Sequence, residues 1–261
     1  MKLLSFNVHA WQEEDQLRKI ADLAADIAKE RYDVIALQEV SQRIDSPLVD
    51  SNLREDNYGL VLLKELERLG VTDYSLHWTQ AHIGFEVYEE GVAIITRHKV
   101  TDVQELFTTT SRTMDFWKTR RIIRTEIKVN NEDYTFYSGH FGWWNDEEEP
   151  FKDQWERLVE TVQPDQTTFV MGDLNNDALV RAEGYDYVLS DGFYDTYILA
   201  EKKDDGLTIT GEIAGWEGNK AGRRIDYILV NKRLTVQSSF VRFDGKETPI
   251  LSDHAGVVVE I

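Results

Sequence analysis

Polar side chains that could do chemistry stand at the ends of several apolar segments. The stretch MGDLNND (171–177) places two carboxylates and two amides directly behind the apolar run TTFVMG (167–172). Alone, such a stretch is typical of a tight turn, because Gly, Asp and Asn tolerate unusual backbone angles. Further polar residues end, interrupt or precede other apolar runs, namely Asn7, Glu39, His140, Asp226 and the pair Asp253 and His254.

These interruptions point to one shared site. A charged or amide side chain in an apolar run must be paired, hydrogen-bonded or bound to an ion. Because they recur at strand ends, we expect the sheets to bring these edges together. Carboxylates and amides supply the hard oxygens that Mg²⁺ or Mn²⁺ prefers, Cys is absent, and the His residues are too scattered for a zinc triad. Metal-assisted hydrolysis of a phosphate ester fits this set best.

The elements that would position these residues begin with a βαβ unit. KLLSFNV (2–8) is typical of a central strand, and residues 15–30 place apolar side chains on one helical face. YDVIALQEV (32–40) predicts a second buried strand. A strand, helix and strand within about 40 residues favour parallel pairing of the two strands.

The rest of the chain predicts mixed strand pairing within one domain, 1–261. Helices are expected at 58–70 and 150–162, and polar loops at 41–57 and 200–224. NNED (130–133) predicts an antiparallel hairpin. The further expected strands are 74–81, 90–97, 120–129, 133–140, 167–172, 223–230 and 254–261.

Composition narrows the partners. The formal net charge of −19 disfavours binding to a phosphate backbone, and KTRRIIR (118–124) is the only local basic cluster. Strand alternation would bury or scatter half of that cluster. We see no signal-peptide core and no window approaching the length of a membrane span, so we expect a cytoplasmic protein without a membrane partner.

Six motifs in order resemble the endonuclease/exonuclease/phosphatase superfamily. They are FN (6–7), LQEV (37–40), SGHF (138–141), GDLN (172–175), RIDYILV (224–230) and SDH (252–254). The resemblance covers residues 2–261 and implies an α/β fold, a four-layer α-β-β-α sandwich of two mixed sheets as in deoxyribonucleases. It also implies Mg²⁺-dependent hydrolysis of phosphate esters, with Mn²⁺ as a second possible ion.

The resemblance also implies roles around the metal. Glu39 matches the carboxylate that binds Mg²⁺, and Asn7 matches an amide that supports the metal or the phosphate. Asp253 is expected near the metal. The sequence leaves open whether one or two ions act.

For the reaction itself, the resemblance implies that His254 contacts the scissile phosphate and that Asp226 orients His254. Asp173 matches the residue that positions or deprotonates the attacking water. Asn175 is expected to hold phosphate oxygens, with His140 on the other side of the phosphate.

Structural alternatives exist for each residue. Asn7 could cap a loop, Glu39 could pair with an Arg, Asp226 could pair with Arg223 or Arg224, and His140 could be a core histidine. No motif supports a functional role for the remaining histidines, His9, His77, His82 and His98.

Substrate hypotheses depend on aromatic residues beside the phosphate site. Trp143 and Trp144 follow His140 in HFGWWND and could stack on a sugar ring or a base, or could fill a core. The favoured hypothesis is a phosphatase that acts on a small sugar phosphate. The sequence is similar to short cytosolic family members of Gram-positive bacteria, which include maltose 6'-phosphate phosphatases. The alternatives are a metal-dependent endo- or exonuclease or phosphodiesterase, and a non-catalytic binding module.

Overall fold

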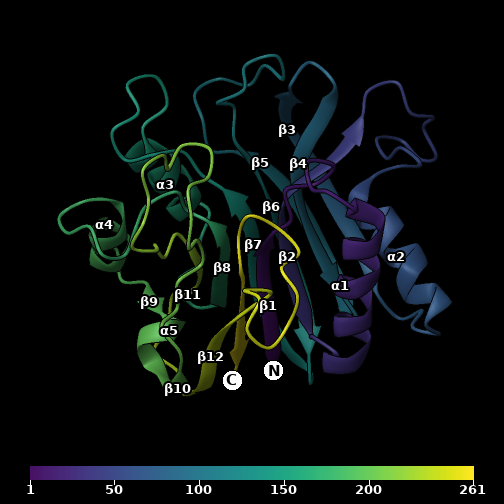
Figure 1. Ribbon diagram of the computed structural model, residues 1–261. Coiled ribbons are helices and arrows are strands. Elements are labelled where there is room, and N and C mark those ends of the chain that lie inside the picture. The colour runs from purple at the N-terminus through teal and green to yellow at the C-terminus, as the bar shows by residue number, and fades with distance from the viewer.

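Two β-sheets lie face to face, with helices on their outer sides, in a computed structural model that describes residues 1–261 (Figure 1). The helices are α1 (Gln16–Glu30), α2 (Tyr58–Arg68), α3 (Phe151–Val159), α4 (Gly184–Ser190) and α5 (Thr196–Leu199). The strands are β1 (Lys2–Asn7), β2 (Val34–Arg43), β3 (Ser75–Gly84), β4 (Tyr88–Thr96), β5 (Lys99–Phe107), β6 (Arg121–Val129), β7 (Glu132–His140), β8 (Thr167–Asp173), β9 (Tyr194–Asp195), β10 (Ala200–Lys203), β11 (Asp226–Val230), β12 (Val236–Arg242) and β13 (Gly256–Glu260).

Both sheets are mixed. The first has the order β10-β12-β13-β1-β2-β4-β3, and the second has the order β5-β6-β7-β8-β11-β9. The βαβ prediction is confirmed, because β1 and β2 pair in parallel and α1 connects them. The hairpin at NNED is also confirmed, because β6 and β7 pair antiparallel on either side of it.

Three apolar cores separate four layers. One core packs α1 and α2 against the outer face of the first sheet, and another fills the space between the sheets. The third packs α3 and α4 against the second sheet. In Figure 1, α1 and α2 lie on the right of the sheets and α3 and α4 on the left. The predicted α-β-β-α sandwich is therefore confirmed.

Some elements differ from the sequence prediction. The edge strand β5 and the strand β12 were not predicted, because polar residues interrupt both and neither has a continuous apolar run. The helix α4 was also not predicted. The predicted helix 150–162 is regular only to Val159. None of the helices combines the length and apolar character that crossing a membrane requires.

Candidate active site

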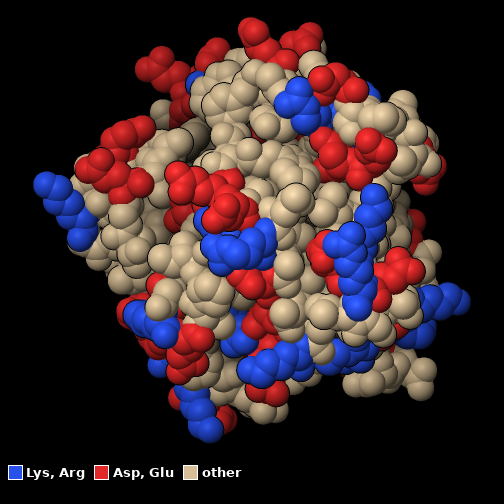
Figure 2. Space-filling view, turned by 45° about the vertical axis from the view of Figure 1, so that its right-hand side comes forward, with Lys and Arg blue, Asp and Glu red and all other residues tan.

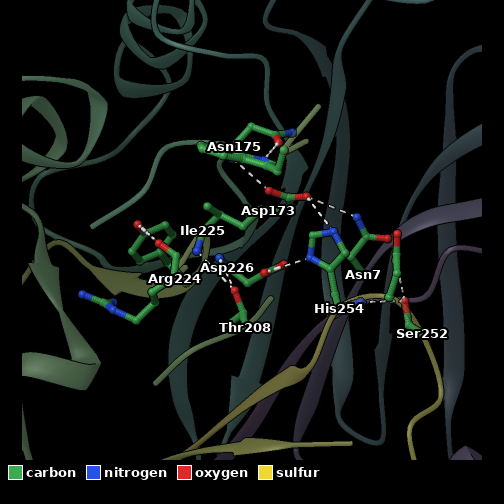
Figure 3. A network of polar contacts seen from close by, with 12 residues as sticks. Asn7, Asp173, Asn175, Thr208, Arg224, Ile225, Asp226, Ser252 and His254 are labelled. Atoms are coloured by element: carbon green, nitrogen blue, oxygen red, sulfur yellow. Dashed lines mark hydrogen bonds and ion pairs between the residues drawn. The ribbon is translucent and has the colours of Figure 1, made fainter. Parts of the chain in front are cut away.

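Strand ends from both sheets meet at one edge of the sandwich. β1 ends at Asn7, β7 at His140 and β8 at Asp173, while β11 begins at Asp226. Because β8 and β11 run antiparallel, Asp173 and Asp226 are register partners although they lie at opposite ends of their strands. His254 precedes β13 and reaches this edge from the other sheet. Figure 3 shows Asn7, Asp173, Asp226 and His254 pointing toward one another.

Paired glycines allow β7 and β8 to approach closely beside the site. Gly139 and Gly172 are register partners, and so are the next residues, His140 and Asp173. A Cβ at Gly172 would stand 1.9 Å from the carbonyl oxygen of Gly139, and Gly172 has φ +153°. Only glycine fits there. The glycines of the SGHF and GDLN motifs thus bring His140 and Asp173 side by side.

A β-bulge orients Glu39. The β2–β4 register shifts between Leu37 and Val40, and Glu39 has φ +53°. A bulge re-aims a side chain, and a non-glycine residue in the left-handed region is strained, so this backbone is typical of a functional position. No Arg or Lys pairs with Glu39, which removes the ion-pair alternative.

Asn7 links Glu39 to Asp173. Its Nδ2 donates to Glu39 Oε1 at 2.8 Å and to Asp173 Oδ2 at 3.2 Å. Its Oδ1 accepts from the backbone N–H of His9 at 3.2 Å, so Asn7 also fixes the loop after β1. The amide therefore holds two carboxylates close together.

Asp226 holds His254 from behind. His254 Nδ1 lies 3.0 Å from Asp226 Oδ2, and His254 Nε2 lies 3.8 Å from Asp173 Oδ2. Burial by itself would lower the pKa of His254, but the charges of Asp226 and Asp173 raise that pKa to about 10. His254 is therefore an imidazolium at neutral pH in the metal-free site.

The nearby arginines have other partners, so they do not neutralise Asp226. Arg223 pairs with Asp177 and Arg224 with Asp195. The backbone N–H groups of Ile225 and Asp226 donate to Thr208 Oγ1, which fixes the start of β11 (Figure 3).

The donor set fits a hard divalent cation. Burial and the charge of Asp226 raise the pKa of Asp173 to about 7, which shows that carboxylates are crowded together here. Neither Glu39 nor Asp173 has a Lys or Arg partner, and Asp226 Oδ1 is buried without a hydrogen bond. A divalent cation among such oxygens would offset this charge. Asp173, Asp226 and His254 also bring three side-chain atoms within 4.8 Å of one another, and the His254 nitrogen can act as a ligand only when the ring is neutral.

Asp253 lies beside His9 at the rim of the cleft. Its Oδ1 is 3.6 Å from His9 Nδ1, which also contacts Glu13 Oε1 at 2.7 Å. Asp253 lines the same cleft as Glu39, and its charge contributes to the raised pKa of His254. Asp253 therefore faces the site from the loop before β13.

His140 and Asn175 form the other side of the site. Asn175 Nδ2 donates to the carbonyl oxygen of Phe141 at 2.9 Å and lies 3.1 Å from His140 Nε2. Burial, followed by the charge of Arg120, lowers the pKa of His140 well below its usual range. The neutral His140 therefore accepts at Nε2. It lines the cleft, so the core-histidine alternative does not describe it.

Sequence reasoning missed Arg120. In the basic cluster 118–124, Lys118 pairs with Asp146, Arg121 with Glu105 and Arg124 with Glu126. Arg120 is the one basic residue of this cluster that has no such pairing. Arg120 is 4% exposed, forms no ion pair, has an Nε without a partner and lines the cleft.

Two further cleft residues surround Arg120. Burial, with the charge of Glu39, raises the pKa of Glu90 to about 8, and burial, with the charge of Arg120, lowers the pKa of His82 to about 3. His9 and His82 line the cleft although no motif marked them, whereas His77 and His98 do not. The residues around His82 in the sequence do not predict a functional role for it, because only the pairing of β3 with β4 brings His82 next to Glu90.

An aromatic wall of Phe85, Trp117 and Trp143 lines the outer part of the cleft, whose volume is about 480 Å³. Trp117 and Trp143 meet edge to face at 6.3 Å, and Phe85 stands exposed at the tip of the β3–β4 hairpin with φ +51°. Trp144 is not among the lining residues. Its ring packs against Phe151 and Tyr187, so the alternative of core packing describes it.

The comparisons with known proteins cover the whole chain. The profile of the Endonuclease/Exonuclease/phosphatase family matches residues 4–254. An endonuclease/exonuclease/phosphatase family protein from Leptotrichia buccalis is 44% identical, with a TM-score of 0.94, over 100% of this chain and 99% of that chain. No curated protein matches.

More distant structures share the fold. A mannosyl-6-phosphatase from Bacteroides thetaiotaomicron is 17% identical, with a TM-score of 0.72, over 100% of this chain and 98% of that chain. D. rerio TDP2, complexed with a single-strand DNA product, is 16% identical, with a TM-score of 0.65, over 99% of this chain and 97% of that chain.

Proposed function

Because this chain belongs to the endonuclease/exonuclease/phosphatase family of metal-dependent hydrolases, we propose that it is a phosphatase that uses Mg²⁺ to hydrolyse a small sugar phosphate. The reaction releases inorganic phosphate from a monoester. Maltose 6'-phosphate is the first substrate to test.

The unpaired Arg120 is the observation that carries this proposal. A buried guanidinium without a carboxylate partner is costly unless an anion binds it. Arg120 lies in the cleft that also holds Asp173 and His254. A monoester phosphate carries up to two negative charges, so it offers more charge to Arg120 and the imidazolium of His254 than a diester does. A small dianionic substrate would therefore satisfy both cations.

The protein groups have distinct tasks in this mechanism. His254, held by Asp226, donates from Nε2 to a phosphoryl oxygen and stabilises the charge that develops there. Asp173, as a carboxylate, orients the attacking water and accepts its proton. Asn175 and His140 line the opposite side of the phosphate site.

The metal would be held by carboxylates. Glu39 and Asp253 would supply oxygen ligands, and Asn7 would keep Glu39 beside Asp173 through its amide. When bound, Mg²⁺ supplies positive charge that stabilises the phosphoryl oxygens during in-line attack.

The aromatic wall supports a sugar as the leaving group. Aromatic faces can stack on the apolar face of a sugar ring, and the indole Nε1 of Trp143 is buried without a partner. A hydroxyl of the substrate could accept from it. The volume of about 480 Å³ lies in the usual range for a small-molecule site, about 300–1,000 Å³. The related fold of a mannosyl-6-phosphatase is compatible with this class of substrate.

The surface charge gives little support to a nucleic-acid substrate. In the view of Figure 2, acidic side chains predominate around the upper end of the molecule, while Lys and Arg are mixed with acidic groups in the lower half. In the basic cluster 118–124, every Lys and Arg except Arg120 has an acidic partner. A duplex-binding surface normally needs clustered, available cations.

Phosphate release from a substrate panel tests the proposal. The panel contains maltose 6'-phosphate, mannose 6-phosphate, nucleotides, single-stranded DNA and plasmid DNA, each with Mg²⁺. We expect a sugar phosphate to give the highest kcat/KM, and Asp173→Ala to remove that activity. Nicked plasmid without phosphate release from any monoester would instead favour the nuclease alternative, and no hydrolysis at all would favour the binding module.

The neighbouring tryptophans give a matched pair for the sugar. Trp143→Phe is expected to raise KM for the sugar phosphate by about tenfold, since stacking and one hydrogen bond are weakened. KM for glycerol 3-phosphate, which has no ring, should change much less. Trp144→Phe makes the same exchange outside the cleft and should leave both KM values unchanged.

A further inference from the structure

Trp216 contacts Asn175 from a segment that the sequence predicts only as a loop. Its indole Nε1 donates to Asn175 Oδ1 at 3.1 Å. The guanidinium of Arg223 lies over the Trp216 ring, 4.7 Å from its centre, and pairs with the buried Asp177 at 2.8 Å. The ring of Trp216 therefore contacts Asn175 through its N–H edge and Arg223 through its face.

The contact fixes which way the Asn175 amide points. An indole N–H is a donor only, so the group that faces it must be the amide oxygen. The NH₂ group is then directed toward the carbonyl oxygen of Phe141 and the Nε2 of His140. Asn175 has φ +50°, and its backbone N–H donates to Asp173 Oδ1 at 2.8 Å. No other group donates a hydrogen bond to Asn175 Oδ1.

The same segment reaches the aromatic wall. A Cβ at Gly215 would stand 2.5 Å from the ring of Trp143, and Gly215 has φ +80°. Ile213, Ala214 and Gly215 line the cleft. One short stretch therefore contacts the outer wall through Gly215 and the phosphate side through Trp216.

We propose that Trp216 is a positioning residue that acts through Asn175. It holds the amide oxygen away from the phosphate, so that the NH₂ group stays directed at the carbonyl oxygen of Phe141 and at His140 Nε2 and fixes the position of the His140 ring. This inference rests on the proposed phosphatase function for its kinetic consequence, but the contact itself does not depend on the substrate.

A double-mutant cycle tests it. Trp216→Phe keeps an aromatic face for Arg223 and removes the N–H. We expect kcat to fall about five- to tenfold, in line with the loss of one hydrogen bond, while KM changes less than twofold. In an Asn175→Ala background the same exchange should change kcat less than twofold, because the group that Trp216 orients is gone. A purely structural role would not produce this dependence.

Trp11→Phe is the matched control. It also removes an indole hydrogen bond, from Trp11 Nε1 to the carbonyl oxygen of Ser41 at 3.0 Å, but Trp11 does not line the cleft. Its kcat should stay within twofold of the wild type.

A readout without turnover separates this inference from the proposed function. In ¹H–¹⁵N spectra of the metal-free protein, the signals of the Asn175 side-chain NH₂ group are assigned as those missing from Asn175→Ala. Trp216→Phe should shift these signals, and Trp11→Phe should leave them in place. If the wild type hydrolyses no monoester, the proposed function fails, and the cycle is repeated on the Kd of inorganic phosphate with Mg²⁺. An unshifted NH₂ pair, or equal effects of Trp216→Phe with and without Asn175, would overturn the role of Trp216.

Discussion

Replacing Asp226 with Asn tests the electrostatic centre of the site. The exchange keeps the shape and a hydrogen-bond acceptor beside His254 but removes the charge. The atoms His254 Nδ1 and Asp226 Oδ2 are 3.0 Å apart, and both side chains are buried. With an effective dielectric constant of about 20, two unit charges at that distance attract by roughly 5–6 kcal/mol.

The pKa of His254 gives a similar magnitude. Its rise from the usual 6.5 to about 10 corresponds to about 5 kcal/mol in favour of the imidazolium. Without the carboxylate of Asp226, the pKa of His254 should fall, because burial lowers it and only the charges of Asp173 and Asp253 remain to raise it. Each pH unit by which the assay pH exceeds the new pKa lowers the charged fraction of His254 about tenfold, so a pKa two units below the assay pH leaves about 1% charged.

We therefore expect Asp226→Asn to lower kcat/KM at pH 8 by about 100-fold. The deficit should shrink toward pH 6, where His254 regains its proton. NMR titration of the His254 ring in metal-free protein measures the pKa directly. Asp195→Asn is the control, because Asp195 is equally buried in the same sheet but pairs with Arg224, so the His254 titration should not move. A wild-type His254 that titrates near 6.5 would refute the reasoning.

Three other outcomes follow from the same geometry. Arg120→Met should raise KM for a phosphate monoester by about 10- to 100-fold, because a charge-assisted hydrogen bond is lost. Steady-state kinetics measures this, and an unchanged KM would contradict a role of Arg120 in binding the phosphate. EDTA should abolish phosphate release, and Mg²⁺ should raise the Tm of the wild type but not of Glu39→Gln. Glu90, whose pKa of about 8 is raised by burial and by Glu39, keeps its proton in the native state between about pH 4.5 and 8, while the unfolded state loses it, so stability falls as pH rises through that window. Thermal unfolding should therefore show Glu90→Gln stabilising the metal-free protein by several degrees more at pH 8 than at pH 5.

The sequence predicted the main strands and their layers well. Apolar runs that bury both faces mark central strands such as β1, β2 and β8, and a helical apolar stripe marks α1. The edge strand β5 escaped prediction, because its exposed face needs no apolar residues.

The types of the site residues were also readable from the sequence. Polar groups that end an apolar strand cannot stay buried without partners, so Asn7, Asp173 and Asp226 stood out before any coordinates. The local pattern gave their chemistry and their place at strand ends. It did not give their partners.

Only the tertiary structure decided which groups meet, because those contacts join residues far apart in the chain. Arg120 differs from its basic neighbours only because acids from other elements, namely Asp146, Glu105 and Asp102, pair with them and leave it unpaired. Trp143 faces the cleft while the adjacent, half-buried Trp144 packs against a core, and Trp216 reaches Asn175 across 41 positions of sequence. Short-range periodicity cannot encode such choices, since they depend on how the two sheets and their loops pack in space.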